Sequence, residues 1–292
     1  MKYGIYYAFW EKEWRADFIP YIEKAKELGF DILEITTADF ANISEAQLDE
    51  LCKAAQYNNV LLTGGYGPRP EHNIGACNCE LVEKTFSFYK MMFGKMERVG
   101  IRSLGGALYS YWPVDFSGPV DKERDRDRSV RGMRRLAAMA QDYGITLNME
   151  ALNRFEGYLI NDAAECAAYV REVDRVNVKV MLDTFHMNIE EDNFRDAIHA
   201  TGGLLGHLHI GECNRKLPGQ GRMDWDEVAV ALHNIGYDGN VVMEPFVLMG
   251  GQVGKDIKVW RDMSQGMTQD QIDRAVTKSL HFIKGKFEWY KA

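Results

Sequence analysis

The chain has 292 residues and a formal net charge of -8, and 46% of its residues are hydrophobic. This length fits one large (β/α)8 domain or two ordinary domains. The acidic balance disfavours a nucleic-acid partner, because phosphate binding requires a basic face. We expect neither a signal peptide nor a membrane association, because the N-terminus leads almost directly into a strand and no apolar run could span a bilayer.

The cysteines are scattered and show no pairing pattern. There are five of them, which is an odd number, and none forms the CxxC spacing of a thiolate metal site: Cys52, Cys77, Cys79, Cys166 and Cys213. Unpaired thiols favour a reducing compartment, so we expect a cytoplasmic protein.

Strand-like and helix-like segments alternate eight times along the sequence. Short apolar runs predict strands at residues 3–8, 31–36, 60–64, 102–107, 145–150, 178–183, 204–209 and 240–244. Amphipathic segments predict helices at residues 17–28, 44–57, 79–98, 124–143, 162–173, 190–200, 225–235 and 268–288. This alternation predicts an α/β fold, a (β/α)8 TIM barrel. No linker or composition break interrupts it, so we expect residues 1–292 to form a single domain.

Local signals mark where the predicted helices begin and end. Glycines stand between helix and strand, where a left-handed residue is favoured, at Gly29, Gly100, Gly144 and Gly236. Capping-box spacing occurs in Ser44 with Gln47 and in Thr268 with Gln271. The loops from strand to helix are long and rich in aromatic residues, glycine and proline. Enlarged loops at one end of a barrel indicate the end that carries the active site.

Potential metal ligands end four consecutive predicted strands, and they are Glu150, Asp183, His209 and Glu244. Because side chains alternate across a strand, each ligand faces away from a set of apolar residues that can pack against outer helices. Three carboxylates and one imidazole suit Mn²⁺, Co²⁺ or Mg²⁺ better than structural Zn²⁺, which prefers closed N/S tetrahedra. On a six-coordinate ion this set leaves positions for substrate oxygens. We therefore expect one divalent ion per chain.

Two more polar residues have the same inward parity. His207 lies two residues before His209 and deeper in the barrel, so we expect a hydrogen-bonded or supporting histidine rather than a ligand. Glu34 faces inward from its strand, and Lys179 is a candidate partner for it inside the barrel.

Five segments closely resemble the ketose 3-epimerases: GGALYSYWP (105–113), MEALNRFEGYLIN (149–161), VMLDTFHMNIEED (180–192), GHLHIGECNRKLPGQGR (206–222) and VVMEPFVLMGG (241–251). The resemblance covers essentially the whole chain. It implies a xylose isomerase-like barrel, a ketohexose substrate, Mn²⁺ or Co²⁺, and a homodimer or homotetramer. The family's metal ligands match the four residues above, and its catalytic pair matches Glu150 and Glu244. Its substrate contacts match Tyr6, Trp14, Ala107, Trp112, Glu156, His186, Arg215 and Phe246.

The implied reaction is inversion at C3 of a ketose, as in the interconversion of D-fructose and D-psicose. A proton must leave one face of C3 and another must return to the opposite face. Because an ordinary carboxylate is a weak base, a metal that chelates O2 and O3 must stabilise the enediolate. Glu150 and Glu244 come from non-adjacent strands, so they can flank the sugar and exchange the roles of base and acid. A single-base mechanism would require the sugar to turn over in the site.

The other matched residues fit a pocket for a polyol. Trp14, Trp112 and Phe246 would form apolar walls against sugar C–H faces. Arg215 is a donor fork for sugar oxygens, with an ion pair to Glu212 as the alternative. His186 and Glu156 are expected at the O1/O2 end. Tyr66 lies in the glycine-rich loop after the third strand, where it could reach the far end of the sugar, and the sequence leaves its role open.

Three other functions fit parts of this pattern. An aldose–ketose isomerase on the same barrel would move hydrogen between C1 and C2, and the fold does not distinguish it. A phosphodiesterase or DNA-repair nuclease would need two or three ions and more histidines at strand ends. A non-catalytic sugar-binding protein would not need two carboxylates beside a metal. The sequence leaves the preferred ketose open among psicose, fructose, tagatose and sorbose.

Overall fold

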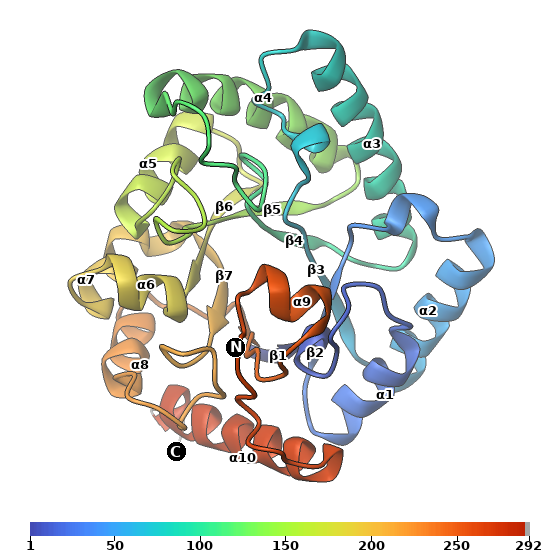
Figure 1. Cartoon of the computed structure of the whole chain (residues 1–292), viewed down its shortest axis with the longest axis vertical. Coiled ribbons are helices and arrows are strands. Elements are labelled where there is room, and N and C mark those ends of the chain that lie inside the picture. Colours follow the sequence, from blue (N-terminus) through green and yellow to red (C-terminus); the bar gives the residue numbers. More distant parts are fainter. Residues whose placement is uncertain (290–292) are drawn as a thin grey trace.

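The computed structural model describes residues 1–289, in which eight parallel strands form a closed barrel in sequence order (Figure 1). The strands are β1 (Lys2–Tyr6), β2 (Ile32–Thr36), β3 (Leu61–Gly65), β4 (Ser103–Gly106), β5 (Thr146–Glu150), β6 (Val178–Asp183), β7 (Leu205–Ile210) and β8 (Asn240–Met243). The predicted (β/α)8 barrel is therefore confirmed. Each predicted strand is present, with ends that differ by at most two residues.

Helices surround the barrel and connect consecutive strands (Figure 1). They are α1 (Ile19–Glu27), α2 (Glu45–Asn58), α3 (Cys79–Arg98), α4 (Lys122–Asp142), α5 (Ala163–Val173), α7 (Phe194–Thr201), α8 (Trp225–Asn234) and α10 (Gln269–Phe287). Two short helices were not predicted, α6 (Thr184–Glu190) and α9 (Gly251–Asp256). Single 3-10 turns are η1 (Tyr7–Phe9), η2 (Phe40–Asn42), η3 (Pro70–His72) and η4 (Gly202–Leu204).

One predicted helix is displaced from its expected start. We predicted a helix over residues 190–200, but α6 ends at Glu190 and α7 begins at Phe194. Asn193 separates them, because its Oδ1 accepts the N–H of Asp196 at 2.8 Å and caps α7. The apolar positions of this stretch therefore belong to two short helices.

The predicted helix boundaries elsewhere are confirmed. Ser44 and Gln47 form a capping box at α2, and Thr268 and Gln271 form one at α10. The four predicted glycines all have positive φ. The same left-handed geometry is taken by Asn59 after α2 and by Asp174 after α5. Local chemistry thus sets most of the helix ends.

Alternation of side chains separates the packing face of each strand from the site. Leu147, Val180, Leu208 and Val241 are fully buried in the hydrophobic core. Asp183 is directly opposite His209 in the β6–β7 register, so both reach the same level of the barrel. The inward face also carries buried polar residues at Glu34, Thr63, Asn148 and His207. This interior is unusually polar for a barrel core and lies directly below the strand ends.

Gly106 at the end of β4 must be a glycine. Its φ is +125°, and a Cβ there would lie 2.3 Å from the carbonyl oxygen of Tyr66. The close approach of the two backbones brings Tyr66 to the rim of the barrel opening.

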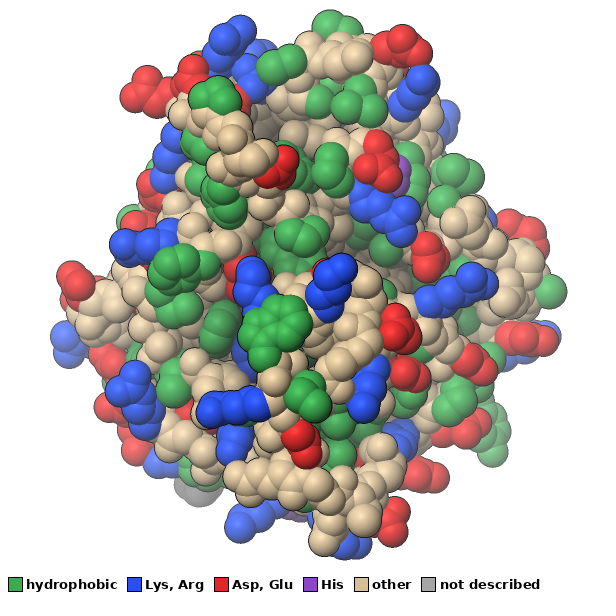
Figure 2. All heavy atoms as spheres, in the orientation of Figure 1, with side chains coloured by type: hydrophobic (Ala, Val, Ile, Leu, Met, Phe, Trp, Pro, Cys, Tyr) green, Lys and Arg blue, Asp and Glu red, His purple; other side chains and the backbone are tan. Residues whose placement is uncertain are grey.

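The strand-to-helix loops gather at one end, and α9 lies across the barrel opening there (Figure 1). Figure 2 shows that this face carries acidic and basic side chains intermixed, with hydrophobic side chains near its centre. Through residue 289, no helix combines the length and apolarity needed to cross a bilayer.

Candidate active site

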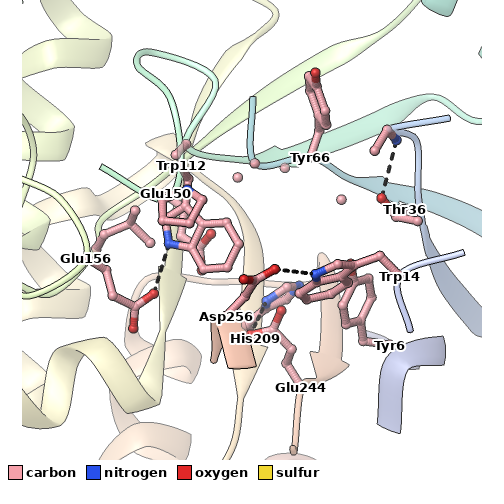
Figure 3. Close-up of a pocket in the computed structure, with 18 of the residues that line it drawn as sticks. Tyr6, Trp14, Thr36, Tyr66, Trp112, Glu150, Glu156, His209, Glu244 and Asp256 are labelled. Carbon is pink, nitrogen blue, oxygen red and sulfur yellow. Dashed lines mark hydrogen bonds and ion pairs between the residues drawn. The ribbon is translucent and has the colours of Figure 1, made fainter. Parts of the chain in front are cut away.

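A cavity of about 380 Å³ opens among the carboxyl ends of the strands. Its lining includes carboxylates, imidazoles and Arg215, together with aromatic rings and small or apolar residues. Figure 3 shows Glu150, His209 and Glu244 grouped on the same side, with Tyr6, Trp14 and Trp112 around them. Polar groups that converge in a mostly apolar pocket are typical of a small-molecule site.

The four predicted ligands converge in space. One ligand atom from each of Glu150, Asp183, His209 and Glu244 lies within 4.8 Å of the other three. Asp183 and His209 are buried, while Glu150 and Glu244 are partly open to the cavity. His209 Nδ1 lies 3.4 Å from Glu244 Oε2 but has no hydrogen-bond partner within the described chain. A buried ring nitrogen without a partner, beside three carboxylates, fits a hard or borderline divalent cation.

The carboxylates of this buried cluster repel one another. Burial, followed by the charges of Glu244 and Asp183, raises the pKa of Glu150 well above its ordinary value. Burial alone would raise the pKa of Asp183 as well, but Arg215, His186 and His209 together lower it. A cation between these carboxylates would relieve the repulsion that Glu150 experiences.

Arg215 provides positive charge at this point. Its Nη1 lies 2.5 Å from Asp183 Oδ2 and 2.8 Å from Glu244 Oε2. Its guanidinium carbon lies 3.9 Å from the ring centroid of Phe185. The alternative ion pair between Arg215 and Glu212 is wrong, because the guanidinium points to the acidic cluster instead.

Glu212 organises the loop that carries Arg215. Its buried carboxylate accepts hydrogen bonds from Gly219 N at 2.7 Å, Met223 N at 3.1 Å and Trp225 Nε1 at 2.9 Å. Arg215 has a φ of +62°, and its carbonyl accepts the N–H of Phe246 at 2.8 Å. These bonds fix the backbone from which the guanidinium extends.

His186 and Glu156 lie beside the cluster and are linked by Asn153. Asn153 Nδ2 lies 2.7 Å from His186 Nδ1 and donates to Glu156 Oε1 at 3.1 Å. His186 Nε2 lies 3.7 Å from Glu150 Oε1, toward the cavity. Burial lowers the pKa of His186, and the charges of Glu156 and Asp183 oppose this shift. Asn153 was not predicted as a site residue, although it is three residues before Glu156 in the same loop.

Aromatic side chains from distant segments form the cavity walls. Trp14 lies centrally, with its ring centroid 6.5 Å from that of Tyr6, 6.4 Å from Trp112 and 6.4 Å from Phe246. Trp112 Nε1 donates to Glu156 Oε2 at 3.1 Å, which joins the aromatic wall to the polar side (Figure 3). Ala107 also lines the cavity. Seven of the eight predicted substrate contacts line this cavity, and the eighth, Phe246, packs against Tyr6 and Trp14.

Two residues that the sequence left open have clear partners. Tyr66 lines the cavity, but its hydroxyl is hydrogen-bonded to His72 Nδ1. Figure 3 shows this hydroxyl directed away from Glu244 and His209. The predicted pairing of Glu34 with Lys179 is wrong, because Glu34 lies against His209 and His207. Closure of the barrel brings β7 close enough for this contact.

Comparison with known proteins agrees with this geometry. The family model described as xylose isomerase-like TIM barrel matches residues 22–263. The D-psicose 3-epimerase of Ruminiclostridium cellulolyticum is 49% identical, covering 100% of this chain and 99% of its own. The D-psicose 3-epimerase of Agrobacterium fabrum is also 49% identical, and the match covers 97% of this chain and 98% of that protein. A crystal structure of D-psicose 3-epimerase with D-tagatose from Clostridium cellulolyticum H10 superposes with a TM-score of 0.97 at 49% sequence identity. The superposition covers 98% of this chain and 99% of that chain.

The chain belongs to the ketose 3-epimerase family. It is a carbohydrate epimerase, because curated relatives of nearly half-identical sequence over the full length carry that activity.

The epimerase also has a cover over its cavity that the sequence did not predict. Trp14 Nε1 donates to Asp256 Oδ2 at 2.8 Å, and Asp256 ends α9 (Figure 3). The N–H of Val253 in α9 donates to the carbonyl of Lys12 at 2.9 Å. Gln252 Nε2 donates to Asp256 Oδ1 at 2.7 Å. The first two bonds join α9 to the loop that carries Trp14, the third lies within α9, and Gln252 and Asp256 line the cavity.

We expect Asp256→Ala to weaken substrate binding by the epimerase more than it slows the reaction. The substitution removes the acceptor that holds the Trp14 ring, and one such bond contributes about 0.5–1.5 kcal/mol. Steady-state kinetics should show a roughly two- to tenfold higher KM with kcat little changed. Asp256→Asn keeps an oxygen acceptor and is the matched control, with a smaller increase. A fall in kcat at constant KM would contradict the assigned role of Asp256.

Proposed function

We propose that this epimerase interconverts D-fructose and D-psicose by inverting C3, with one divalent cation per chain, Mn²⁺ or Co²⁺, or Mg²⁺ as an alternative. The observation that carries the proposal is the convergence of Glu150, Asp183, His209 and Glu244 at the carboxyl ends of β5 to β8. The names of the curated relatives support D-psicose as a substrate.

The same four side chains would hold the cation. Carboxylate oxygens and an imidazole nitrogen suit Mn²⁺ and Co²⁺, and the unpartnered Nδ1 of His209 is free to serve as a ligand. When bound, the cation supplies positive charge that polarises the ketone and stabilises the enediolate. Arg215 would then be free to turn from Asp183 and Glu244 toward sugar oxygens.

Glu150 and Glu244 would move the protons. They belong to strands β5 and β8, which are not neighbours in the barrel, so each can approach C3 from a different side. One carboxylate takes the proton from C3, and the other, in its acid form, returns one to the opposite face. Burial and the charge of Glu244 raise the pKa of Glu150, and a higher pKa makes a carboxylate a stronger base.

The remaining side chains would orient the sugar and exclude water. Arg215, His186 and Glu156 offer donors and acceptors beside the acidic cluster, which suits the hydroxyl groups near C1 and C2. Burial would raise the pKa of Glu156, but His186 and Arg215 lower it, so Glu156 is an anionic acceptor. The apolar walls of Tyr6, Trp14, Trp112, Ala107 and Phe246 would pack against the C–H faces of the sugar.

Incubation of D-fructose in heavy water with the Mn²⁺-loaded protein tests the proposed reaction. We expect D-psicose as the product, with deuterium at C3, because the returned proton comes from a carboxyl group in exchange with solvent. An aldose product with deuterium at C1 or C2 and none at C3 would contradict the proposal and favour the aldose–ketose isomerase. Replacing D-fructose by D-tagatose and D-sorbose in the same assay measures the substrate preference.

Several sequence-based expectations remain predictions. A homodimer or homotetramer, a cytoplasmic location, and a single domain over residues 1–292 belong to this group. The last three residues of that range lie outside the described part of the chain.

A further inference from the structure

Glu34 on β2 is a buried carboxylate that the proposed reaction does not use. Its side chain is 1% exposed, and it accepts a hydrogen bond from Thr63 Oγ1 at 2.7 Å. His209 Nε2 lies 2.6 Å from its Oε1, and His207 Nε2 lies 3.1 Å from its Oε2. Removing a carboxylate from water costs several kcal/mol unless its oxygens are well partnered. Such a group in a barrel interior therefore calls for an explanation.

A second metal site is one explanation, because single ligand atoms of Glu34, His207 and His209 lie within 4.8 Å of one another. The distances argue against it. Ligands about 2.0–2.2 Å from a shared ion are separated by about 3 Å or more at tetrahedral or octahedral angles. Glu34 Oε1 and His209 Nε2 are only 2.6 Å apart. This separation is that of a charge-assisted hydrogen bond.

The hydrogen bond determines which nitrogen of His209 can bind a cation. A neutral imidazole has one N–H donor and one nitrogen with a free lone pair. Because a carboxylate only accepts, contact with Glu34 requires the proton of His209 on Nε2. The lone pair is then on Nδ1, the atom that lies 3.4 Å from Glu244 Oε2 without a hydrogen bond in the described chain. Thr63, on the other side, donates the hydrogen bond that holds Glu34 in place, and His207 Nε2 lies near the same carboxylate.

We infer that Glu34 is a positioning residue that orients His209 and fixes its proton on Nε2, so that Nδ1 is presented to the divalent cation. The inference rests on the proposed function in one respect, namely that the four-residue cluster holds an ion. Carboxylates that support a ligating histidine in this way typically change metal affinity about 10- to 100-fold when they are replaced.

Titration of the metal-free full-length protein with Mn²⁺, followed by the electron paramagnetic resonance signal of free Mn²⁺, tests the inference. We expect one ion per wild-type chain and a dissociation constant about 10- to 100-fold higher in Glu34→Gln. Thr63→Val, which removes only a support of Glu34, should give a smaller increase. Glu191→Gln is the matched control, because its carboxylate accepts the Ala163 N–H at the start of α5, and it should bind as the wild type does.

Different outcomes bear on the role of Glu34 and on the proposed metal site. Equal affinity of wild type and Glu34→Gln overturns the positioning role, and so does a count of two ions per wild-type chain that falls to one in Glu34→Gln. Failure of the wild type to bind Mn²⁺ overturns the proposed function instead. If Glu34→Gln does not fold, ¹⁵N spectra of the histidines in the Mg²⁺-loaded wild type decide. A proton on Nε2 of His209 supports the inference, and a proton on Nδ1 overturns it.

Discussion

Removal of the divalent cation is expected to abolish epimerisation and to lower stability. Charge stabilisation by a metal is worth several kcal/mol, and about 4 kcal/mol corresponds to a thousandfold in rate. Mn²⁺ at a hundredfold excess over its dissociation constant adds about 2.7 kcal/mol to the free energy of unfolding. Chelation should therefore lower the midpoint of thermal unfolding by roughly 4 °C in a chain of 292 residues. Chromatography of the sugars and differential scanning calorimetry measure the two effects.

Asp183→Asn is the informative variant for this prediction, because Asp183 is a proposed ligand but not a proton donor or acceptor. The variant should show little rise in unfolding midpoint when Mn²⁺ is added, whereas Glu191→Gln should respond as the wild type does. Full turnover after exhaustive chelation, with no metal left in the protein by elemental analysis, would contradict the proposed role of the cation.

Replacement of either carboxylate of the proposed catalytic pair is expected to stop turnover. Glu150→Gln and Glu244→Gln each remove one acid–base group, which contributes about 10²- to 10⁴-fold to a rate. Each also weakens the metal site, so kcat is to be measured at saturating Mn²⁺. Glu156→Gln is the matched control at the same cavity, since Glu156 contacts Trp112 and Asn153. Its loss should be smaller and should appear mainly in KM. A kcat within tenfold of wild type in either catalytic variant would contradict the assignment.

The barrel and the ligand cluster could be predicted because they follow from local patterns. Each strand has four to six residues that include apolar side chains, and its parity decides which side chains face inward. A closed parallel barrel then brings the carboxyl ends of all strands together. Asp183 and His209 were expected to meet on this ground, and they are register partners.

Of the two helices that the sequence missed, α6 has a local N-cap signal, whereas α9 depends on a tertiary contact. In α6 the proposed ligand Asp183 is also the N-cap, since its Oδ1 accepts the Phe185 N–H at 2.9 Å. The sequence of α9, GQVGKD, contains two glycines and has no propensity for a helix. Its backbone bond to Lys12 comes from the opposite end of the chain. A contact between segments so far apart in the chain leaves no signal in the local sequence of α9.

Partners of buried polar groups were the least predictable part of the site. Glu34 and His209 are 175 residues apart, and Trp14 and Asp256 are 242 residues apart. Strand parity placed Glu34 inside the barrel, but it did not distinguish Lys179 from His209 as the partner of Glu34. For Arg215 likewise, nearness in sequence to Glu212 suggested a pair, whereas the left-handed backbone at Arg215 turns its side chain to Asp183 and Glu244.

Hydrogen exchange at C3 in the two single variants tests most directly whether opposed carboxylates invert this carbon. Glu150→Gln and Glu244→Gln are each incubated with D-fructose and with D-psicose in heavy water at saturating Mn²⁺, and deuterium at C3 of the recovered sugar is measured by mass spectrometry. We expect complementary results, in which one variant exchanges C3 of one epimer only and the other variant exchanges C3 of the other epimer only. Exchange of both epimers by one variant and of neither by the other would show that a single base serves both faces, and would contradict the account.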